Sequence, residues 1–374
     1  MRSDWKEYAL GDLLSYEQPT AYIVESTDYD DKYKTPVLTA GKTFILGYTN
    51  EKQGIYDALP VIIFDDFTTT SQYVNFKFKV KSSAMKILTA NAELVLPKFI
   101  FYRMQIIKFD ASTHKRYWIQ HYSKIKVKIP PISEQERIVS RIEELFSQLD
   151  ASVAELKTAK ERLKVYRQAV LKEAFAFCSE TVRICELCNV VRGGSPRPAG
   201  DTKYYDGAIP FLKVADLTNT SEMYLTTFTS TIKEAGLKKT RLVPANTLLL
   251  SNSGATLGVP KICRFQTTFN DGIAAFLNLD EEREYLPYHY YFWMSQTVAL
   301  RAIDQGAAQP NLNTTIIGNV LIPHCTYEEQ VKISQKIESR LSVCDNIEKT
   351  VDTALQQAEA LRQSILKKAF EGKL

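Results

Sequence analysis

The sequence predicts an α/β (α+β) protein in which two similar mixed α/β domains are joined by two long helices, paired as an antiparallel coiled coil with approximate two-fold symmetry. Three observations predict it: a helical segment occurs twice, both copies carry an apolar stripe at coiled-coil spacing, and fainter matches precede each copy. The 374 residues suffice for two or three domains. We place a first domain at 1–130, a central helix at 131–178, a second domain at 179–322 and a C-terminal helix at 323–374.

The duplicated segment is the clearest internal repeat. Arg167-Gln-Ala-Val-Leu-Lys-Glu-Ala-Phe175 recurs 195 residues later as Arg362-Gln-Ser-Ile-Leu-Lys-Lys-Ala-Phe370. Three upstream pairs keep the same order while their separation grows from 174 to 190 residues: Pro36–Leu38 with Pro210–Leu212, Val61–Phe64 with Thr247–Leu250, and Leu96-Pro97 with Leu286-Pro287. A growing separation indicates one core fold that carries loops of different length in its two copies.

Both predicted helices carry a stripe spaced four and three residues apart, as in a coiled coil. Pro130-Pro131 precede the first helix, and Ser133 with Glu136 predicts a capping box at its start. At 1.5 Å per residue this helix is about 65 Å long. The first stripe is Ile138, Ile142, Leu145, Leu149, Ser152, Leu156, Ala159, Leu163, Tyr166 and Val170; the second, with the charged Arg340 inside it, is Ile333, Ile337, Arg340, Cys344, Ile347, Val351, Ala354, Ala358, Leu361 and Ile365.

Each stripe would be exposed to water in an isolated helix, so we expect the two helices to cover each other within one chain. Two alternatives stay open: each helix packs on its own domain, or the helices join two chains. Antiparallel pairing implies an approximate two-fold axis, and duplex DNA has such axes as well. Two unlike domains arranged in this way would read two different half-sites.

The net charge of +4 does not by itself indicate nucleic acid, but the charge is unevenly distributed. Twelve basic residues against Glu93 and Asp110 occupy 77–128, whereas acidic residues dominate 1–76. The alternation in 76–81 predicts a half-buried strand with its basic side outward. We expect DNA contacts in this domain from Thr68, Thr69, Thr70, Ser71, Lys77, Lys79, Lys81, Ser82, Ser83 and Lys86.

In the second domain, two glycines between arginines form a loop that would let a phosphate approach the backbone closely. Further basic and polar clusters follow, and Asn and Arg suit the reading of adenine and guanine edges. The loop 306–313 is a candidate linker. We expect DNA contacts here from Arg192, Gly193, Gly194, Ser195, Arg197, Lys213, Lys238, Lys239, Arg241, Ser251, Asn252 and Ser253.

Catalytic and metal-binding signals are weak. We find no phosphate-binding glycine loop, nucleophile elbow or methyltransferase motif, and we expect no catalytic and no metal-binding residue. The single CxxC, Cys185 to Cys188, lacks the partners of a zinc site. Asp65-Asp66 after a predicted strand is better explained as a loop acid pair than as a nuclease site. Six cysteines and no apparent export signal or apolar span predict reduced thiols in a cytoplasm.

Several motifs resemble those of specificity subunits of type I restriction–modification systems. The resemblance covers nearly the whole chain. It rests on the helix entry Ile129-Pro-Pro-Ile-Ser-Glu-Gln135, its copy Glu328-Glu-Gln330 after Ile322-Pro323, the two repeated helix ends, Glu371–Leu374, Thr35–Lys42, Leu46–Thr49, Val61–Phe67, Gly193–Pro196, Ile209–Leu217 and Ser253–Thr256. Arg340 within the second stripe departs from the pattern.

The resemblance implies two target-recognition domains that each read half of a split, asymmetric site in double-stranded DNA. The helices would set the spacing and dock two modification (methyltransferase) subunits, to which restriction motor-nuclease subunits are added. The complex would methylate adenine N6 with S-adenosylmethionine and cleave DNA with ATP and Mg²⁺, while this chain binds no cofactor, has no catalytic residue, and acts in a bacterial or archaeal cytoplasm away from membranes.

Two other functions remain open from the residues alone. A coiled-coil scaffold with protein-binding domains would not be retained on DNA with or without partners. A nuclease that uses Asp65 and Asp66 would cleave DNA as the purified chain.

Overall fold

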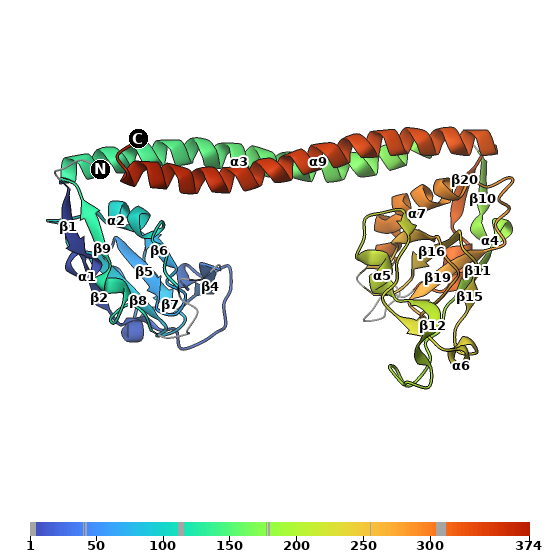
Figure 1. Cartoon of the computed structure of the whole chain (residues 1–374), viewed down its shortest axis with the longest axis horizontal. Helices are drawn as coiled ribbons and strands as arrows, with labels where there is room; N and C mark the ends of the chain where they lie inside the picture. Colours follow the sequence, from blue (N-terminus) through green and yellow to red (C-terminus); the bar gives the residue numbers. More distant parts are fainter. Residues whose placement is uncertain are drawn as a thin grey trace. The chain divides into compact units, whose positions relative to one another are not determined.

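The computed structural model describes residues 5–39, 41, 43–110, 116–176, 178, 180–254, 256–303 and 312–374, and these form two compact units. Unit 1 comprises 1–157 and 352–374, and unit 2 comprises 158–351. Each contains a globular domain and part of each long helix, α3 (Ile132–Ala174) and α9 (Tyr327–Phe370) (Figure 1). Among the described residues, no helix combines the length and apolarity that crossing a membrane requires.

The domain of unit 1 is built on an antiparallel sheet of order β2-β8-β5-β6, with β4-β3-β7 and β1-β9 beside it. Helix α2 lies between that sheet and the long helices (Figure 1). The elements are β1 (Lys6–Ala9), α1 (Leu10–Leu13), β2 (Leu14–Glu17), η1 (Pro19–Tyr22), β3 (Thr35–Leu38), β4 (Ile45–Thr49), β5 (Val61–Asp65), β6 (Ser71–Val74), β7 (Lys79–Val80), β8 (Met85–Ala90), α2 (Pro97–Met104), η2 (Tyr122–Lys124) and β9 (Lys126–Ile129).

The domain of unit 2 has sheets of order β11-β19-β16-β17-β13, β14-β12-β18-β15 and β10-β20, and α7 lies between the first sheet and the long helices (Figure 1). The elements are β10 (Glu180–Arg183), α4 (Ile184–Leu187), β11 (Asn189–Arg192), β12 (Tyr205–Leu212), α5 (Val214–Thr218), β13 (Tyr224–Leu225), β14 (Thr231–Ile232), α6 (Glu234–Leu237), β15 (Leu242–Val243), β16 (Thr247–Ser251), β17 (Pro260–Cys263), β18 (Thr267–Phe269), β19 (Ile273–Leu277), α7 (Leu286–Arg301), α8 (Thr314–Gly318) and β20 (Leu321–His324).

The strand registers confirm that the two domains share one core fold. In unit 1 Ile62 pairs with Leu88, and in unit 2 Leu248 pairs with Phe276 in the same antiparallel arrangement. The parallel pairs β3 with β7 and β12 with β18 also correspond. One match from the sequence is wrong by one residue: α2 begins at Pro97 and α7 at Leu286, so the two prolines occupy the first and second positions of their helices.

The long helices pair antiparallel within each unit, as predicted. In unit 1, Arg362 pairs with Asp150 and stacks 4.4 Å from the Phe146 ring. In unit 2, Arg167 lies 2.6 Å from Asp345 and 2.9 Å from Glu348. The two Arg–Asp contacts are equivalent, because Asp150 and Asp345 are 195 residues apart, as are Arg167 and Arg362.

The long helices also pack on the globular domains, so the alternative that each helix packs on a domain is true together with the pairing of the helices. In unit 1 a single core joins Phe99 of α2, Ile142 of α3 and Phe370 of α9. Arg340, the departure in the second stripe, supports pairing: its guanidinium lies 2.7 Å from Glu173 and over the Tyr166 ring.

The capping box predicted at Ser133 is wrong, because α3 already begins at Ile132 and Ser133 lies inside it. A capping box occurs at α9 instead. The backbone N–H of Thr326 donates to the Glu329 carboxylate at 2.9 Å, and the Glu329 N–H donates to the Thr326 hydroxyl at 3.4 Å. Pro131 occupies the corresponding position before α3 and has no hydroxyl.

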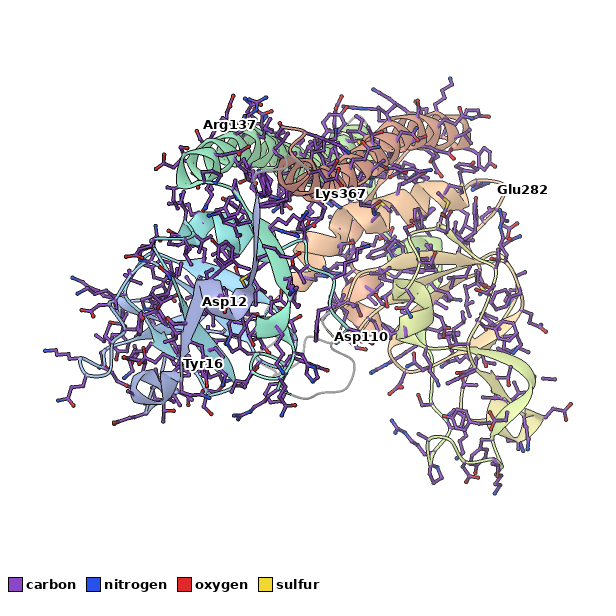
Figure 2. The ribbon with its side chains drawn as sticks, turned by 60° about the vertical axis from the view of Figure 1, so that its left-hand side comes forward. Asp12, Tyr16, Asp110, Arg137, Glu282 and Lys367 are labelled. Carbon is purple, nitrogen blue, oxygen red and sulfur yellow. The ribbon has the colours of Figure 1, made fainter. Side chains whose placement is uncertain are left out.

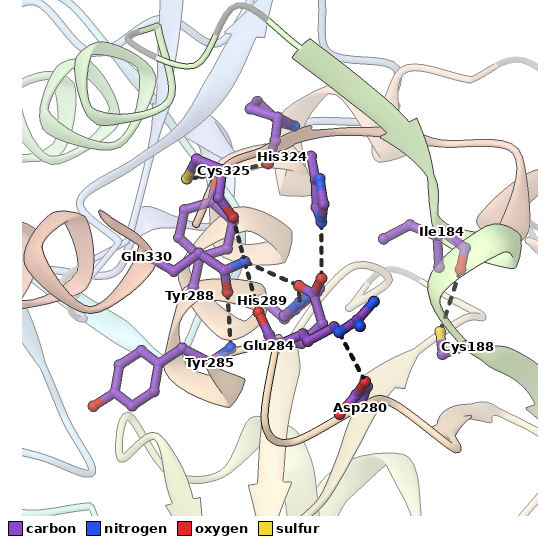
Figure 3. A network of polar contacts seen from close by, with 12 residues as sticks. Ile184, Cys188, Asp280, Glu284, Tyr285, Tyr288, His289, His324, Cys325 and Gln330 are labelled. Carbon is purple, nitrogen blue, oxygen red and sulfur yellow. Dashed lines mark hydrogen bonds and ion pairs between the residues drawn. The ribbon is translucent and has the colours of Figure 1, made fainter. Parts of the chain in front are cut away.

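A buried glutamine anchors the start of each long helix to its domain. Gln135 accepts a hydrogen bond from the Leu96 N–H (2.8 Å) and donates to the carbonyls of Leu94 (3.0 Å) and Pro130 (2.9 Å). Gln330 repeats this arrangement: it accepts from the Tyr285 N–H at 2.8 Å and donates to the Cys325 carbonyl at 3.1 Å (Figure 3). The Glu-Gln repeat thus marks the junction of helix and domain.

In unit 2 the anchor is extended by a buried carboxylate. Glu284 accepts hydrogen bonds from Gln330, from His289 of α7 at 2.8 Å and from His324 of β20 at 2.9 Å (Figure 3). Burial opposes ionisation of Glu284, but the hydrogen bonds from His289, His324 and Gln330 outweigh it and lower the pKa of this carboxyl group. The network ties α7 and β20 to the start of α9.

We expect Gln135→Leu to lower the free energy of unfolding of unit 1 by about 2–3 kcal/mol, because it leaves a buried N–H and two carbonyls without their partner. Gln330→Leu should destabilise unit 2 similarly. Denaturant unfolding measures both effects. Gln168→Leu, on an exposed position of α3, is the control and should change stability by less than about 0.5 kcal/mol. Equal stabilities of Gln135→Leu and the control would contradict the anchoring role.

Candidate nucleic-acid interface

The basic segment of unit 1 does not present all its lysines to solvent. Lys77 and Lys81 are exposed, and Lys77 makes a surface ion pair at 3.4 Å with Asp57. Lys79 is buried: its ammonium lies 2.7 Å from the Glu51 carboxylate and donates to the Gln53 carbonyl at 2.7 Å. The predicted outward basic side is therefore wrong at Lys79, because β7 is only two residues long and packs beside β3.

Lys86 is also buried, on β8, where its ammonium lies 3.3 Å from the Asp66 carboxylate. Both side chains are at most 3% exposed. Asp66 in addition accepts the Trp118 N–H at 2.8 Å. Tyr16 lies at the surface on edge strand β2 (Figure 2). Its ring centroid lies 5.5 Å from the Lys86 ammonium. Lys86 was predicted to contact DNA, but its ammonium is buried in an ion pair of the core and is not accessible at the surface.

The turn between β5 and β6 presents small hydroxyl side chains. Asp65 holds the turn by accepting the N–H groups of Phe67 (2.8 Å) and Thr68 (2.9 Å). Thr68 and Thr70 are exposed, and their hydroxyls lie 3.0 Å apart. Asp65 and Asp66 both have structural partners, which favours the loop acid pair over a nuclease site.

The remaining small residues of this region differ in exposure. Thr69 is half-buried and adopts a left-handed backbone with φ 60°. Ser71 is buried, and its hydroxyl accepts a hydrogen bond from Gln105 at 2.9 Å. Ser82 and Ser83 are exposed after Lys81. The accessible candidates in unit 1 are therefore Thr68, Thr70, Lys77, Lys81, Ser82 and Ser83.

The glycine loop of unit 2 is closely packed against its own domain. A Cβ atom on Gly193 would lie 2.3 Å from the Asn270 carbonyl oxygen, and one on Gly194 would lie 2.3 Å from that of Lys239. Ser195 donates to the Asp271 carboxylate at 2.6 Å, and this bond lowers the pKa of Asp271. The glycines allow close approach, as expected, but the approaching backbone is that of the protein itself.

The other candidates in unit 2 fall into an exposed and a buried group. Ser251 is buried and bonded to the Thr256 carbonyl at 2.7 Å, Asn252 is buried, and Ser253 is half-buried. Arg192 is half-buried, and its Nε donates to the Asp271 carbonyl. The loop 306–313 lies outside the described residues except for Leu312 and Asn313. The exposed candidates are Arg197, Lys213, Lys238, Lys239 and Arg241.

A cleft of about 310 Å³ opens beside Lys213 and was not predicted from the sequence. Its walls come from residues 199–206, which lead into β12, from Lys213 just after β12 and from the segment 228–231 at the start of β14. Lys213 lies within the motif Ile209–Leu217 and was predicted to contact DNA, whereas the other lining residues were not predicted. The lining residues are Ala199, Gly200, Tyr205, Asp206, Lys213, Phe228, Thr229, Ser230 and Thr231.

Cysteines and acids do not assemble into a metal site in the described part of the chain, where no group of three or more His, Cys, Asp and Glu side chains has metal-binding geometry. The CxxC cysteines point to different surroundings: Cys185 is exposed, whereas Cys188 is buried and donates to the Ile184 carbonyl (Figure 3). Burial raises the pKa of the Cys188 thiol to about 12. The site candidates that remain are basic and hydroxyl side chains suited to DNA.

Comparison with known proteins identifies relatives along the whole chain. A family model described as type I restriction modification DNA specificity domain matches residues 2–161 and again 179–357. The specificity subunit of the type I restriction enzyme EcoR124I/EcoR124II from Escherichia coli is 34% identical over 95% of this chain and 90% of its own length. The EcoBI specificity subunit of Escherichia coli is 30% identical over 66% of this chain and 58% of its own.

Solved structures share the fold. One, from a study of complex assembly and conformational transition of the type I R-M system, has a TM-score of 0.76 at 18% identity and covers 100% of this chain and 99% of its own. The HsdS subunit from Thermoanaerobacter tengcongensis has a TM-score of 0.57 at 18% identity, over 100% and 98% of the two chains.

Proposed function

The chain belongs to the family of type I restriction–modification DNA specificity proteins, and on this basis we propose that it is the DNA-recognition subunit of such a complex. Each domain reads one half of a split, asymmetric site in double-stranded DNA. The observation that carries the proposal is the double match of one DNA specificity model to two domains that share a core fold but differ in their surface loops.

The helices set the distance between the half-sites and dock two modification subunits and the restriction motor-nuclease subunits. S-adenosylmethionine, ATP and Mg²⁺ belong to those subunits, which methylate adenine N6 and cleave DNA in the cytoplasm. This chain contributes recognition and no catalytic residue. The Arg–Asp contact that the two helices make in each unit supports their pairing in this role.

The exposed cations and hydroxyls contact DNA in this proposal. In unit 1 these are Thr68, Thr70, Lys77, Lys81, Ser82 and Ser83, and in unit 2 they are Arg197, Lys213, Lys238, Lys239 and Arg241. The buried Lys79 and Lys86 support the surface from beneath, and Gly193, Gly194 and Ser195 shape the loop that carries Arg197. In this proposal the buried or half-buried candidates do not contact DNA themselves: Thr69, Ser71, Arg192, Ser251, Asn252 and Ser253.

The experiment that tests the proposal is co-expression of the chain with its modification subunit, followed by mapping of methylated adenines in the host genome. We expect one bipartite motif with two unlike halves and a constant spacer. Methylation without a motif, or none with an active modification subunit, would contradict the proposal and favour a scaffold without a DNA role.

We expect Lys77→Ala combined with Lys81→Ala to weaken DNA binding by the complex about equally for all sequences. Each lost phosphate contact should reduce the slope of log K against log salt by about 0.9. Binding titrations at several salt concentrations measure the slope. Lys52→Ala, an exposed lysine in the acidic part of unit 1, is the control. An unchanged slope would remove these two lysines from the interface.

A further inference from the structure

The two domains differ most in the segment that lines the cleft of unit 2. Between the equivalent positions Leu38 and Val61 of unit 1 lie 22 residues, but between Leu212 and Thr247 of unit 2 lie 34. Five of the nine lining residues, Lys213 and Phe228–Thr231, belong to this longer segment. Segments that the domains share maintain the fold, so a segment in which they diverge is where different DNA sequences can be distinguished.

The cleft is held rigid by a buried carboxylate. Asp216, 8% exposed, accepts the Lys213 N–H at 2.7 Å, the Thr229 N–H at 3.1 Å and the Thr229 hydroxyl at 2.7 Å. The Phe228 ring packs 5.3 Å from that of Phe265. The Tyr205 hydroxyl donates to the Pro196 carbonyl at 2.8 Å. The backbone at Lys213 and the Phe228 ring are therefore held in place before any ligand binds.

The side chains at the opening combine a cation with an apolar ring. Lys213 is exposed and Phe228 is 42% exposed, although aromatic rings are usually covered. Strand β12, which carries Tyr205 and Asp206 of the lining, lies on the side of the unit 2 domain away from its long-helix segments (Figure 1). The Lys213 and Phe228 side chains at the opening are therefore accessible to a ligand.

We propose that this cleft reads base edges in the half-site bound by the second domain, with the Lys213 ammonium donating to guanine O6 or N7 and the Phe228 ring contacting a thymine methyl group. These are the pairings that the chemistry of the major groove favours for a cation and an aromatic ring. The inference rests on the proposed function and adds to it the residues that determine specificity.

The test compares methylation motifs made by the complex containing Phe228→Ala, Lys213→Gln or the unaltered chain. Each substitution should relax one base position within a single half-site by about fivefold or more and leave the other half-site and the spacer unchanged. Val298→Ala and Arg283→Ala are matched controls, since both side chains are exposed in unit 2 outside the cleft. Thermal melting confirms that each variant is folded.

The outcomes distinguish a failure of the proposed function from a failure of the cleft inference alone. If the unaltered complex makes no bipartite motif, the proposed function fails. If it makes one and neither folded cleft variant alters it, or the altered position lies in the half-site of the first domain, the cleft inference alone is overturned. Two chemically different substitutions keep the test decisive should one variant fail to fold.

Discussion

Replacing residues 179–322 with the corresponding segment of another specificity subunit is expected to change one half of the methylated motif completely and to leave the other half unchanged. The sequence repeat and the shared strand registers support this result, because each domain completes its own sheets. The segment starts just before β10 and ends within β20, which pair with each other, so both cut points lie at one edge of the domain, and Pro323 and His324 of β20 stay with the host chain.

Genome-wide methylation mapping measures the outcome, and the reciprocal exchange of residues 1–130 is its control. Anchoring matters for the design: Gln330 of α9 binds the Tyr285 N–H, which would come from the incoming domain. A segment from another specificity subunit should retain this contact if the residue at the position of Tyr285 is not proline and so keeps its backbone N–H. If both half-sites change together, the domains do not read DNA independently, and the proposed division of labour fails.

The second large effect is expected from Lys86→Met, which should lower the free energy of unfolding of unit 1 by about 3–5 kcal/mol. The Asp66 carboxylate would remain buried without its cation, and an uncompensated buried charge is strongly destabilising. DNA affinity of the folded protein should be unchanged, because the Lys86 side chain is 1% exposed. Denaturant unfolding and DNA binding at low temperature measure the two effects separately.

A double-mutant cycle provides the control. Asp66→Asn keeps an oxygen for the Trp118 N–H, so the double variant Lys86→Met with Asp66→Asn should lose at least about 1 kcal/mol less than the sum of the single losses. Lys81→Met, an exposed lysine nearby, should leave stability within about 0.5 kcal/mol of the unaltered chain. A loss of DNA affinity without loss of stability in Lys86→Met would return this lysine to the interface.

The helices and the duplication could be predicted because their signals are periodic and local. The stripe, the 195-residue repeat and the growing separations follow from sequence alone, and Arg340 was compatible with pairing because its partner Glu173 lies on the facing helix. The start of the first helix was misplaced, since a Ser and a Glu three residues apart resemble a capping box wherever they occur.

The exposure of individual lysines could not be predicted, because it depends on partners that are distant in sequence. Lys79 meets Glu51, and Lys86 meets Asp66, through strand pairings that a period-two pattern does not specify. The glycine loop illustrates the same limit: its neighbours, Asn270 and Lys239, are brought close only by the folded sheets. Apart from Lys213, which lies within the motif Ile209–Leu217, the residues that line the cleft belong to no motif that the sequence analysis recognised.

The division of the chain affects the order in which its parts can mature during synthesis. Unit 2 is one continuous stretch, 158–351, whereas unit 1 is assembled from both sides of it. The unit 1 core includes Ile365, Leu366 and Phe370, so the first domain to leave the ribosome stays incomplete until the last helix follows. During synthesis, unit 2 can therefore complete its core before unit 1 does. A chain truncated shortly before residue 352 would lack the part of α9 that completes the core of unit 1, while unit 2 would keep nearly all its residues.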